Sequence, residues 1–344
     1  MSKNFIFADK PPVRKKSDDQ KLSKQPDVEL VNPFSTGAGG SNFENSVQSA
    51  FVILMLSGGV APCLPPWPIK KIKLQGRYAG FNTDDFIAFT EEQNGGRGAK
   101  LLAQIKHSLS ITEKDEVFAK VIKAAWLDFR NPEIFDPKYD KIALITGPLS
   151  SQDVEDARRV LEWARTSESA REFLEKVNLS NFSSETKRQK LQAFRTQLKR
   201  ANNGDDVDDE TFWEFMKCFH MLGYDLDAQS GVTLSLLNSH IAQFTITNVA
   251  GIWGMVAKEI ESFNQSAGTI TIETLSQEIR TVFSTRIPVE TIPAEFAQQK
   301  KESATTTPLK SEQADALALA NLLGGWNEKA EGDKAVIRNL IEGQ

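Results

Sequence analysis

Cysteine and histidine are scarce in this chain of 344 residues, which has two cysteines and three histidines. Cys63 and Cys218 stand in unrelated segments and form no Cys-x-x-Cys motif, which excludes a disulfide scaffold and a cysteine-based zinc cluster. Two isolated thiols fit a reducing compartment, so we expect a cytoplasmic protein. With only three histidines, a histidine-centred metal site is equally disfavoured.

Long hydrophobic runs are also missing. The longest apolar stretch, SAFVILMLSGGVAP at 49–62, is too short to cross a bilayer, and the polar N-terminus has no secretory signal pattern. We therefore expect no membrane partner. The glycine cluster at 35–46 lacks the Lys-Ser/Thr of a phosphate-binding loop, so we also expect no ATP hydrolysis by this chain. The net charge of -5 leaves nucleic-acid contact to local basic patches.

Composition divides the chain into four segments. Residues 1–34 are polar and charged, which predicts a disordered tail. Residues 35–150 predict an α/β core with a mixed sheet, in the order helix, three strands, helix, strand. Residues 151–297 predict a mainly helical domain. Residues 298–344 predict a linker and the start of a further helical region, and because its helical pattern continues almost to residue 344, we expect more chain to follow.

Periodicity places the elements of the core. Ser41 and Glu44 have the spacing of a capping box at the start of the first helix. Alternating or continuous apolar residues predict strands at 69–78, 84–90, 99–108 and 140–149, and a 3.6-residue period predicts helices at 116–131, 150–177, 183–204 and 205–227.

The second and third strands form a predicted hairpin with ionic groups inside it. A turn centred on Gly95 would place Asp84 opposite Lys106, whereas a turn centred between Gly95 and Gly96 would place Asp85 there. Gln104 shares a face with Lys106, because side chains alternate along a strand. A structural salt bridge is the alternative interpretation, although a buried ion pair is weak evidence for stability.

An acid that heads one strand, with Gln-x-Lys in the next, suits metal-assisted hydrolysis. The acid binds a hard divalent cation through oxygen, Gln104 adds a ligand or a polar contact, and Lys106 orients the nucleophile and offsets developing negative charge. Glu44 is placed on the preceding helix as a third acid, although its capping role competes.

An ordered set of motifs resembles a known family. The set comprises GGSNFENSVQSAFVILML, IKLQGRYAGFNTDDFIAF, LLAQIKHS, DEVFAKVIKAAWLDF and DKIALITGP. It resembles the PD-(D/E)XK double-stranded DNA endonuclease domain of bacterial antiphage effectors, of the type found in CBASS effector nucleases, and the helical part that accompanies this nuclease is similar to the region through 227.

The resemblance implies a restriction-endonuclease-like core and an endonuclease that cuts double-stranded DNA with low sequence specificity. It implies a site that uses Mg²⁺ or Mn²⁺ and is made of Glu44, Asp84 or Asp85, Gln104 and Lys106, with Gln75 lining it. Gln104 replaces the more usual acid, which removes one anionic ligand and points to weaker metal binding.

Partners follow from the same resemblance. Cutting both strands requires two sites, so we expect a homo-oligomer. An unrestrained nuclease would destroy its host, so we expect a sensor or regulatory subunit or domain, such as a STAND NTPase or an SMC-like or helicase-like ATPase. The segment 317–341 is similar to the region that leads into the sensor of STAND-type defence proteins.

Two basic stretches have two interpretations each. In one interpretation, the basic side chains contact DNA phosphates. In the other, they form a solvated face, and on the first strand their charge also blocks aggregation at the sheet edge. The residues are Lys187, Arg188, Lys190, Arg195, Lys199 and Arg200 in the predicted helix at 183–204, and Lys71 and Lys73 in the first predicted strand.

Two rival functions remain. In the first, the chain is a catalytically inactive nuclease-fold module that binds DNA or serves as a scaffold in a defence or repair complex. In the second, the chain is an RNase. Loss of plasmid cleavage on replacement of Lys106, and comparison of DNA with structured RNA as substrate, separate these hypotheses.

Overall fold

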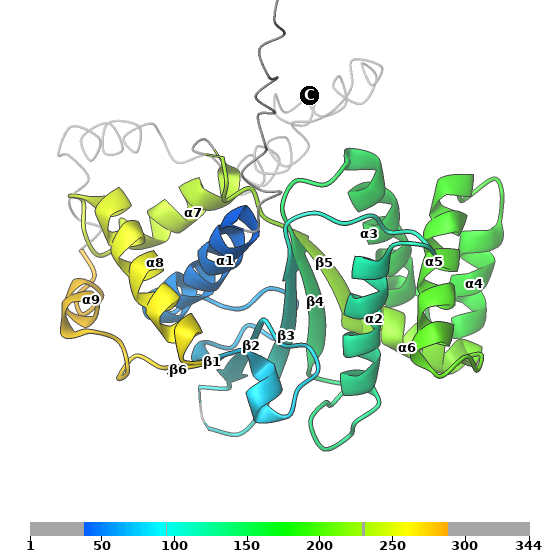
Figure 1. The fold of residues 1–344 in the computed structure, drawn as a ribbon, viewed down its shortest axis with the longest axis horizontal. Coiled ribbons are helices and arrows are strands. Elements are labelled where there is room, and N and C mark those ends of the chain that lie inside the picture. The colour runs from blue at the N-terminus through cyan, green and yellow to red at the C-terminus, as the bar shows by residue number, and fades with distance from the viewer. Residues whose placement is uncertain (1–37, 94, 229–230, 288–344) are drawn as a thin grey trace, which may run out of the picture. The chain divides into compact units, whose positions relative to one another are not determined.

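The centre of the protein is a mixed sheet. The computed structural model describes residues 38–93, 95–228 and 231–287, and in this part of the chain six strands lie in the order β5-β4-β3-β2-β1-β6 (Figure 1). Strands β1 to β3 and β6 pair antiparallel, and β3, β4 and β5 pair in parallel. The strands are β1 (Ile69–Leu74), β2 (Phe86–Glu91), β3 (Gly98–Lys106), β4 (Lys141–Thr146), β5 (Phe219–Gly223) and β6 (Thr269–Ile270). This α/β class with a mixed sheet confirms the coarse prediction.

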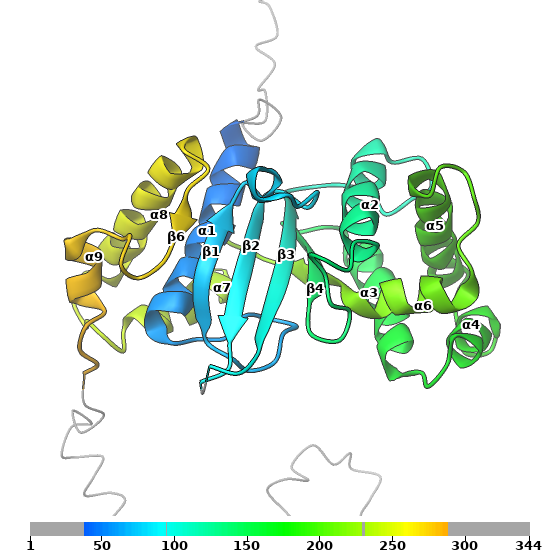
Figure 2. The same ribbon diagram turned by 90° about the horizontal axis from the view of Figure 1, so that it is seen from below.

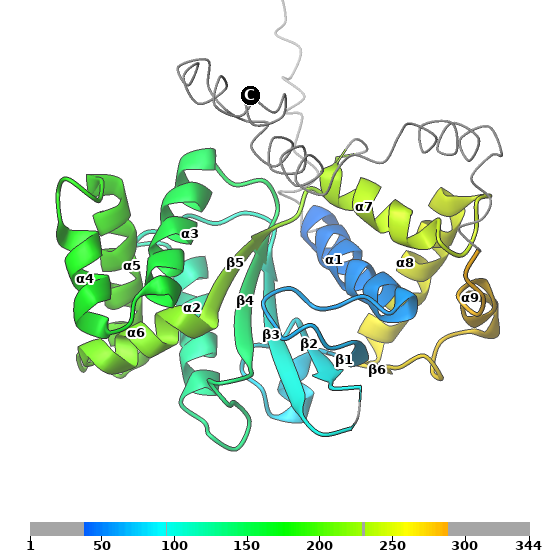
Figure 3. The same cartoon turned by 180° about the vertical axis from the view of Figure 1, so that it is seen from behind.

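Helices cover both faces of the sheet. α1, α7 and α8 lie on one side, whereas α2, α3 and α6 lie on the other with α4 and α5 outside them (Figures 1 and 3). They are α1 (Ala38–Ser57), α2 (Glu116–Phe129), α3 (Ser151–Thr166), α4 (Ala170–Asn178), α5 (Glu185–Ala201), α6 (Asp209–Cys218), α7 (Val232–Ile241), α8 (Val249–Gln265) and α9 (Gln277–Val282), with a short 3-10 helix at Gly76–Ala79. Among the described helices, none has the length and apolar character needed to cross a membrane.

Strand β3 shows how the sequence builds two cores. Leu101, Ala103 and Ile105 pack into the core that includes α1 and α8, whereas Leu102 packs into the opposite core with α2. Figure 2 shows the strands between α1 on one side and α2 on the other. Successive side chains of a strand point to opposite faces, and both faces here are covered. The continuous apolar sequence of β3 and β4 therefore buries both of its faces.

The first helix corrects one local prediction. α1 already includes Ala38, so Ser41 lies inside the helix and does not cap it. The cap predicted between Ser41 and Glu44 is therefore wrong, and Glu44 is not engaged at a helix start. In contrast, Asp115 does cap α2, because its side chain accepts a 2.7 Å hydrogen bond from the backbone N–H of Phe118.

Strand β5 corrects a second prediction. The predicted helix at 205–227 ends at Cys218, and the next five residues, FHMLG, form β5 beside β4. Both β5 and β6 follow residue 150, so the sheet takes strands from both sides of the predicted boundary between core and helical domain. The predicted tail at 1–34 and the predicted linker and helical region at 298–344 lie outside the described residues.

Candidate active site

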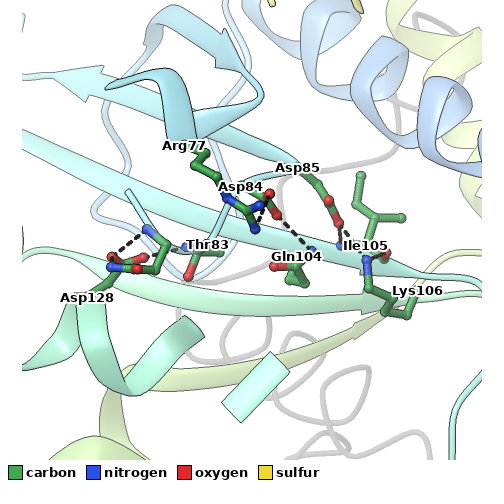
Figure 4. Close-up of polar contacts among 9 residues, drawn as sticks. Arg77, Thr83, Asp84, Asp85, Gln104, Ile105, Lys106 and Asp128 are labelled. Atoms are coloured by element: carbon green, nitrogen blue, oxygen red, sulfur yellow. Dashed lines mark hydrogen bonds and ion pairs between the residues drawn. The ribbon is translucent and has the colours of Figure 1, made fainter. Parts of the chain in front are cut away.

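The two adjacent aspartates lie on the loop that leads into β2, and a buried carboxylate on α2 anchors this loop. Asp128 is fully buried and accepts 2.7 Å hydrogen bonds from the backbone N–H groups of Asn82 and Thr83 (Figure 4). Asp84 and Asp85 follow directly. A loop held this way presents its next side chains in a defined direction.

The backbone after β1 holds the same loop from the other side. Gly76 N–H donates to the Asp84 carbonyl at 2.7 Å, and Gln75 N–H donates to the Asp85 carbonyl at 3.2 Å. Gln75 adopts a left-handed conformation with φ of 51°. A Cβ on Gly76 would lie 2.8 Å from the Thr83 carbonyl oxygen, so the close approach requires glycine there.

Asp85 and Lys106 form the centre of the site. Lys106 Nζ lies 3.2 Å from Asp85 Oδ2 and donates a 2.8 Å hydrogen bond to the Ile105 carbonyl. Asp85 Oδ2 also accepts a hydrogen bond from the backbone N–H of Ile105 (Figure 4). The side chain of Asp85 is 12% exposed and that of Lys106 is 32% exposed, so the amine reaches solvent beside a largely buried carboxylate.

Asp84 points to different partners. Its Oδ2 pairs with the Arg77 guanidinium at 2.8 Å, and its Oδ1 accepts a hydrogen bond of 3.4 Å from Gln104 Nε2. Gln104 is buried, whereas Arg77 is highly exposed. Asp84 and Asp85 therefore occupy neighbouring but separate environments, one beside an arginine and a glutamine and the other beside a lysine.

Glu44 of α1 belongs to the same electrostatic environment. Burial of its carboxyl and the neighbouring charge of Asp85 raise the pKa of Glu44 from 4.5 to about 7, against the opposing charge of Lys106. The pKa of Asp85 is also raised, mainly by burial, although Lys106 and the Ile105 N–H oppose the rise. Burial thus disfavours the charged form of both carboxyl groups, and a cation bound between them would stabilise it.

A polar network behind Glu44 was not found from the sequence. Gln48 is fully buried one helical turn after Glu44, and its Nε2 donates to Glu44 Oε1 at 3.1 Å and to the Asp85 carbonyl at 3.2 Å. Asn264 of α8 donates its side-chain amide to Gln48 Oε1. Gln75 Nε2 donates to the Asn264 carbonyl at 2.7 Å. The network thus connects α1, α8 and the loop after β1 to the backbone of Asp85.

The hairpin register differs from both predicted registers. Phe86 pairs with Ala103, so the same register extended would place Lys106 opposite Thr83 rather than Asp84 or Asp85. Lys106 nevertheless reaches Asp85, because the long lysine side chain spans the diagonal separation between neighbouring strands. The structure thus brings together Asp85 and Lys106, and Asp84 and Gln104, with Glu44 close enough for its pKa to respond to Asp85 and Lys106.

The predicted basic contacts have partners within the protein. Each cationic residue predicted on α5 pairs with a carboxylate, which favours the interpretation as structural ion pairs on this outer helix. The pairs are Lys187–Asp156, Arg188–Glu185, Lys190–Asp153, Arg195–Asp209, Lys199–Asp206 and Arg200–Glu116. Lys73 Nζ donates to the Ala267 carbonyl at 2.6 Å, and Lys71 Nζ lies 4.2 Å from the centre of the Phe89 ring.

The donor chemistry fits a hard divalent cation. Among the described residues, no group of three or more Asp, Glu, His and Cys side chains is arranged to hold a metal by itself. Mg²⁺ does not need such a cage, since it usually binds one or two carboxylates and completes its shell with water and substrate phosphates. Glu44 and Asp85 supply two carboxylates in one partly buried environment whose negative charge a cation would offset.

Comparison with known proteins gives no relative. No protein-family model, no curated protein and no solved structure matches this chain. The function must therefore be argued from the chemistry of the site.

Proposed function

We propose that the protein is a metal-dependent endonuclease that hydrolyses phosphodiester bonds of double-stranded DNA with low sequence specificity. One observation carries the proposal: the Lys106 amine lies 3.2 Å from the largely buried Asp85 carboxylate. The raised pKa of the Glu44 carboxyl in the same environment supports it. A partly exposed amine beside two partly buried carboxyl groups suits phosphate hydrolysis, which needs a cation and metal-binding carboxylates close to the scissile phosphate.

Lys106 supplies positive charge where negative charge develops. Its amine is oriented by Asp85 Oδ2 and the Ile105 carbonyl and keeps about a third of its side chain exposed. A cation held this way stabilises the oxygens of the phosphate and orients the attacking water without reorganising. Asp84 and Gln104 border the same site, and Arg77 balances the charge of Asp84.

Glu44 and Asp85 would hold Mg²⁺ or Mn²⁺, with Asp84 and Gln104 as adjacent oxygen donors. When bound, the metal supplies a Lewis acid for the phosphate and lowers the pKa of water. Glu44 must be ionised to serve as a ligand. Its raised pKa therefore makes metal binding by the protein sensitive to pH near neutrality.

The family proposal rests on the ordered motifs together with the local arrangement. We propose a PD-(D/E)XK nuclease with a restriction-endonuclease-like core, because an acid before β2 and Gln-x-Lys at the end of β3 meet beside a helix that carries Glu44. The role proposed with it is an antiphage effector in the cytoplasm, active as a homo-oligomer and controlled by a sensor, such as a STAND NTPase or an SMC-like or helicase-like ATPase.

The test is plasmid cleavage by the purified protein with Mg²⁺ or Mn²⁺. Lys106→Met should abolish nicking while the protein stays folded. Lys100→Met is a matched control, because Lys100 lies on the same strand and pairs with Asp140 at 3.0 Å outside the site. Absence of cleavage in every oligomeric state, with DNA binding retained, would instead support the inactive scaffold. Cleavage of structured RNA in preference to plasmid would support the RNase.

A further inference from the structure

A groove opens at the carboxyl ends of β4 and β5, next to the candidate active site. It has a volume of about 770 Å³ and lies between α3 and the start of α7. We call it the α3 groove. Its lining includes Gly147, Val154, Arg158, Arg159, Tyr224 and Thr233. The lining thus combines apolar side chains with two arginines from the second turn of α3.

The α3 groove and Lys106 lie at the carboxyl ends of neighbouring parallel strands. Lys106 pairs in register with Thr146, and the next residue, Gly147, lines the groove and donates a 3.2 Å hydrogen bond from its N–H to the His107 carbonyl. Strands are spaced about 4.8 Å apart, so the end of β5 lies about 10 Å from the end of β3. That separation corresponds to about three base pairs along a DNA duplex, which rises about 3.4 Å per pair.

The two arginines are uncommitted. Within the described residues, Arg158 and Arg159 are exposed and form no ion pair or side-chain hydrogen bond. The six basic residues predicted on α5 differ from these two arginines, because each of the six pairs with a carboxylate. An arginine with free donors can bind a phosphate without first breaking an existing ion pair.

Three acids share the lining of the groove with the two arginines, and one of them is held in an ion pair. Glu162 pairs with Arg165 at 2.7 Å. Asp225 accepts hydrogen bonds from the backbone N–H groups of Val232 and Thr233 at the start of α7. Glu155 is the remaining acid of the lining, and it lies one helical turn before Arg158 and Arg159. The two guanidinium groups therefore share the groove with Glu155 and Asp225, which form no ion pair within the described part of the chain.

We propose that the α3 groove binds the phosphate backbone of duplex DNA that flanks the cleaved bond, with Arg158 and Arg159 as the contacting residues. This inference rests on the proposed nuclease function and extends it, because it assigns the DNA surface to the sheet edge beside Lys106 and away from α5. The contacts are electrostatic and independent of base sequence.

The experiment measures binding separately from cleavage. The affinity of the full chain for a fluorescent DNA duplex is measured by anisotropy over a range of salt concentrations, with EDTA present so that no cutting occurs. Replacing both residues, Arg158→Gln with Arg159→Gln, should weaken binding about tenfold at low salt. It should also lower the slope of log affinity against log salt by about 2, one phosphate contact for each arginine.

Two control variants define the result. Lys199→Gln with Arg200→Gln removes the same charge from α5 and should leave the salt slope nearly unchanged. Arg158→Lys with Arg159→Lys keeps the charge and should restore most of the slope, which a loss of folding would not allow. Thermal melts of each variant confirm that the comparison is made between folded proteins.

The outcomes separate the two proposals. If the double glutamine variant binds DNA as tightly as wild type, or if wild type binds no DNA, the groove inference is overturned. If Lys106→Met abolishes cleavage while the double glutamine variant binds DNA normally, the proposed nuclease function is supported and DNA binding by the α3 groove is refuted. Should the glutamine variant lose binding while wild type never cleaves, the groove stands as a DNA surface and the nuclease fails.

Discussion

Thr83 donates its backbone N–H to Asp128 at 2.7 Å, and both residues are buried. This contact fixes the loop immediately before the two aspartates from a helix on one face of the sheet. The direction of Asp84 and Asp85 therefore depends on a carboxylate that does not itself belong to the site.

Asp128→Asn tests this dependence. Both carboxylate oxygens of Asp128 accept hydrogen bonds, and asparagine would set an NH₂ donor against one of the donating groups. We expect a loss of about 1.5–3 kcal/mol in the free energy of unfolding, measured by denaturant titration. Nicking by the folded fraction should also fall, because Asp84 and Asp85 lose their fixed direction.

Asp140→Asn is the matched control. Asp140 is equally buried and accepts backbone hydrogen bonds from Lys100 at 2.8 Å and Asp136 at 2.9 Å, outside the site. It should lose at least as much stability, because it also weakens the 3.0 Å ion pair with Lys100, and keep nicking activity per folded molecule. Equal losses of activity in both variants would show that Asp128 has no specific link to the site.

Gln48→Leu tests the network behind Glu44. The substitution keeps a similar volume but removes the donors to the Glu44 carboxylate and the Asp85 carbonyl. Partners of this kind orient ligands, and their loss typically costs about 10- to 100-fold in metal affinity or activity. We expect the Mg²⁺ concentration for half-maximal nicking to rise by about that factor.

Gln197→Leu provides the comparison. Gln197 is also buried and donates to two backbone carbonyls, those of Thr112 and Glu113, between α5 and the loop before α2. It should lower stability without changing the metal requirement. A normal metal requirement in Gln48→Leu would show that Gln48 contributes to packing only and does not orient the metal-binding carboxylates.

The sequence predicted much of the sheet but not its continuation. β1 to β4 and α2 follow from alternation and from a 3.6-residue period, whereas the 3-10 helix at Gly76–Ala79 overlaps the end of the stretch predicted as the first strand. β5 was missed because Phe212, Phe215 and Phe219 keep a helical spacing across the end of α6. A short apolar run at the end of a helix cannot be distinguished from more helix by periodicity alone.

The site was predictable only in its local part. Asp85 and Lys106 are joined by one hairpin, so alternation and a short turn suffice to bring them near each other. Gln48 lies 37 positions before Asp85 and Asn264 lies 216 positions after Gln48, and their contacts depend on how α1 packs against α8 and against the loop before β2. The one available signal was a polar residue at 48 on the apolar face that includes Val47 and Phe51.

Glu44→Gln tests the charge balance of the site through its effect on stability. The pKa of Glu44 is about 7 in the folded protein and about 4.5 when unfolded, so the folded state binds the proton more tightly. Stability contributed by this group is present at low pH and falls as pH rises from 4.5 through 7. The rise in pKa corresponds to at most about 3 kcal/mol.

In EDTA, Glu44→Gln should therefore be more stable than wild type at pH 8 and nearly equal to it at pH 4.5, as measured by denaturant unfolding. Glu261→Gln, at an exposed position of α8, should follow the wild-type curve. Adding Mg²⁺ or Mn²⁺ at pH 8 should stabilise wild type more than Glu44→Gln, because the ionised carboxylate is a ligand only in the former. Parallel curves of stability against pH for wild type and Glu44→Gln would show that the pKa of Glu44 is not raised in the folded protein. Equal stabilisation of both proteins by metal would show that Glu44 is not a metal ligand.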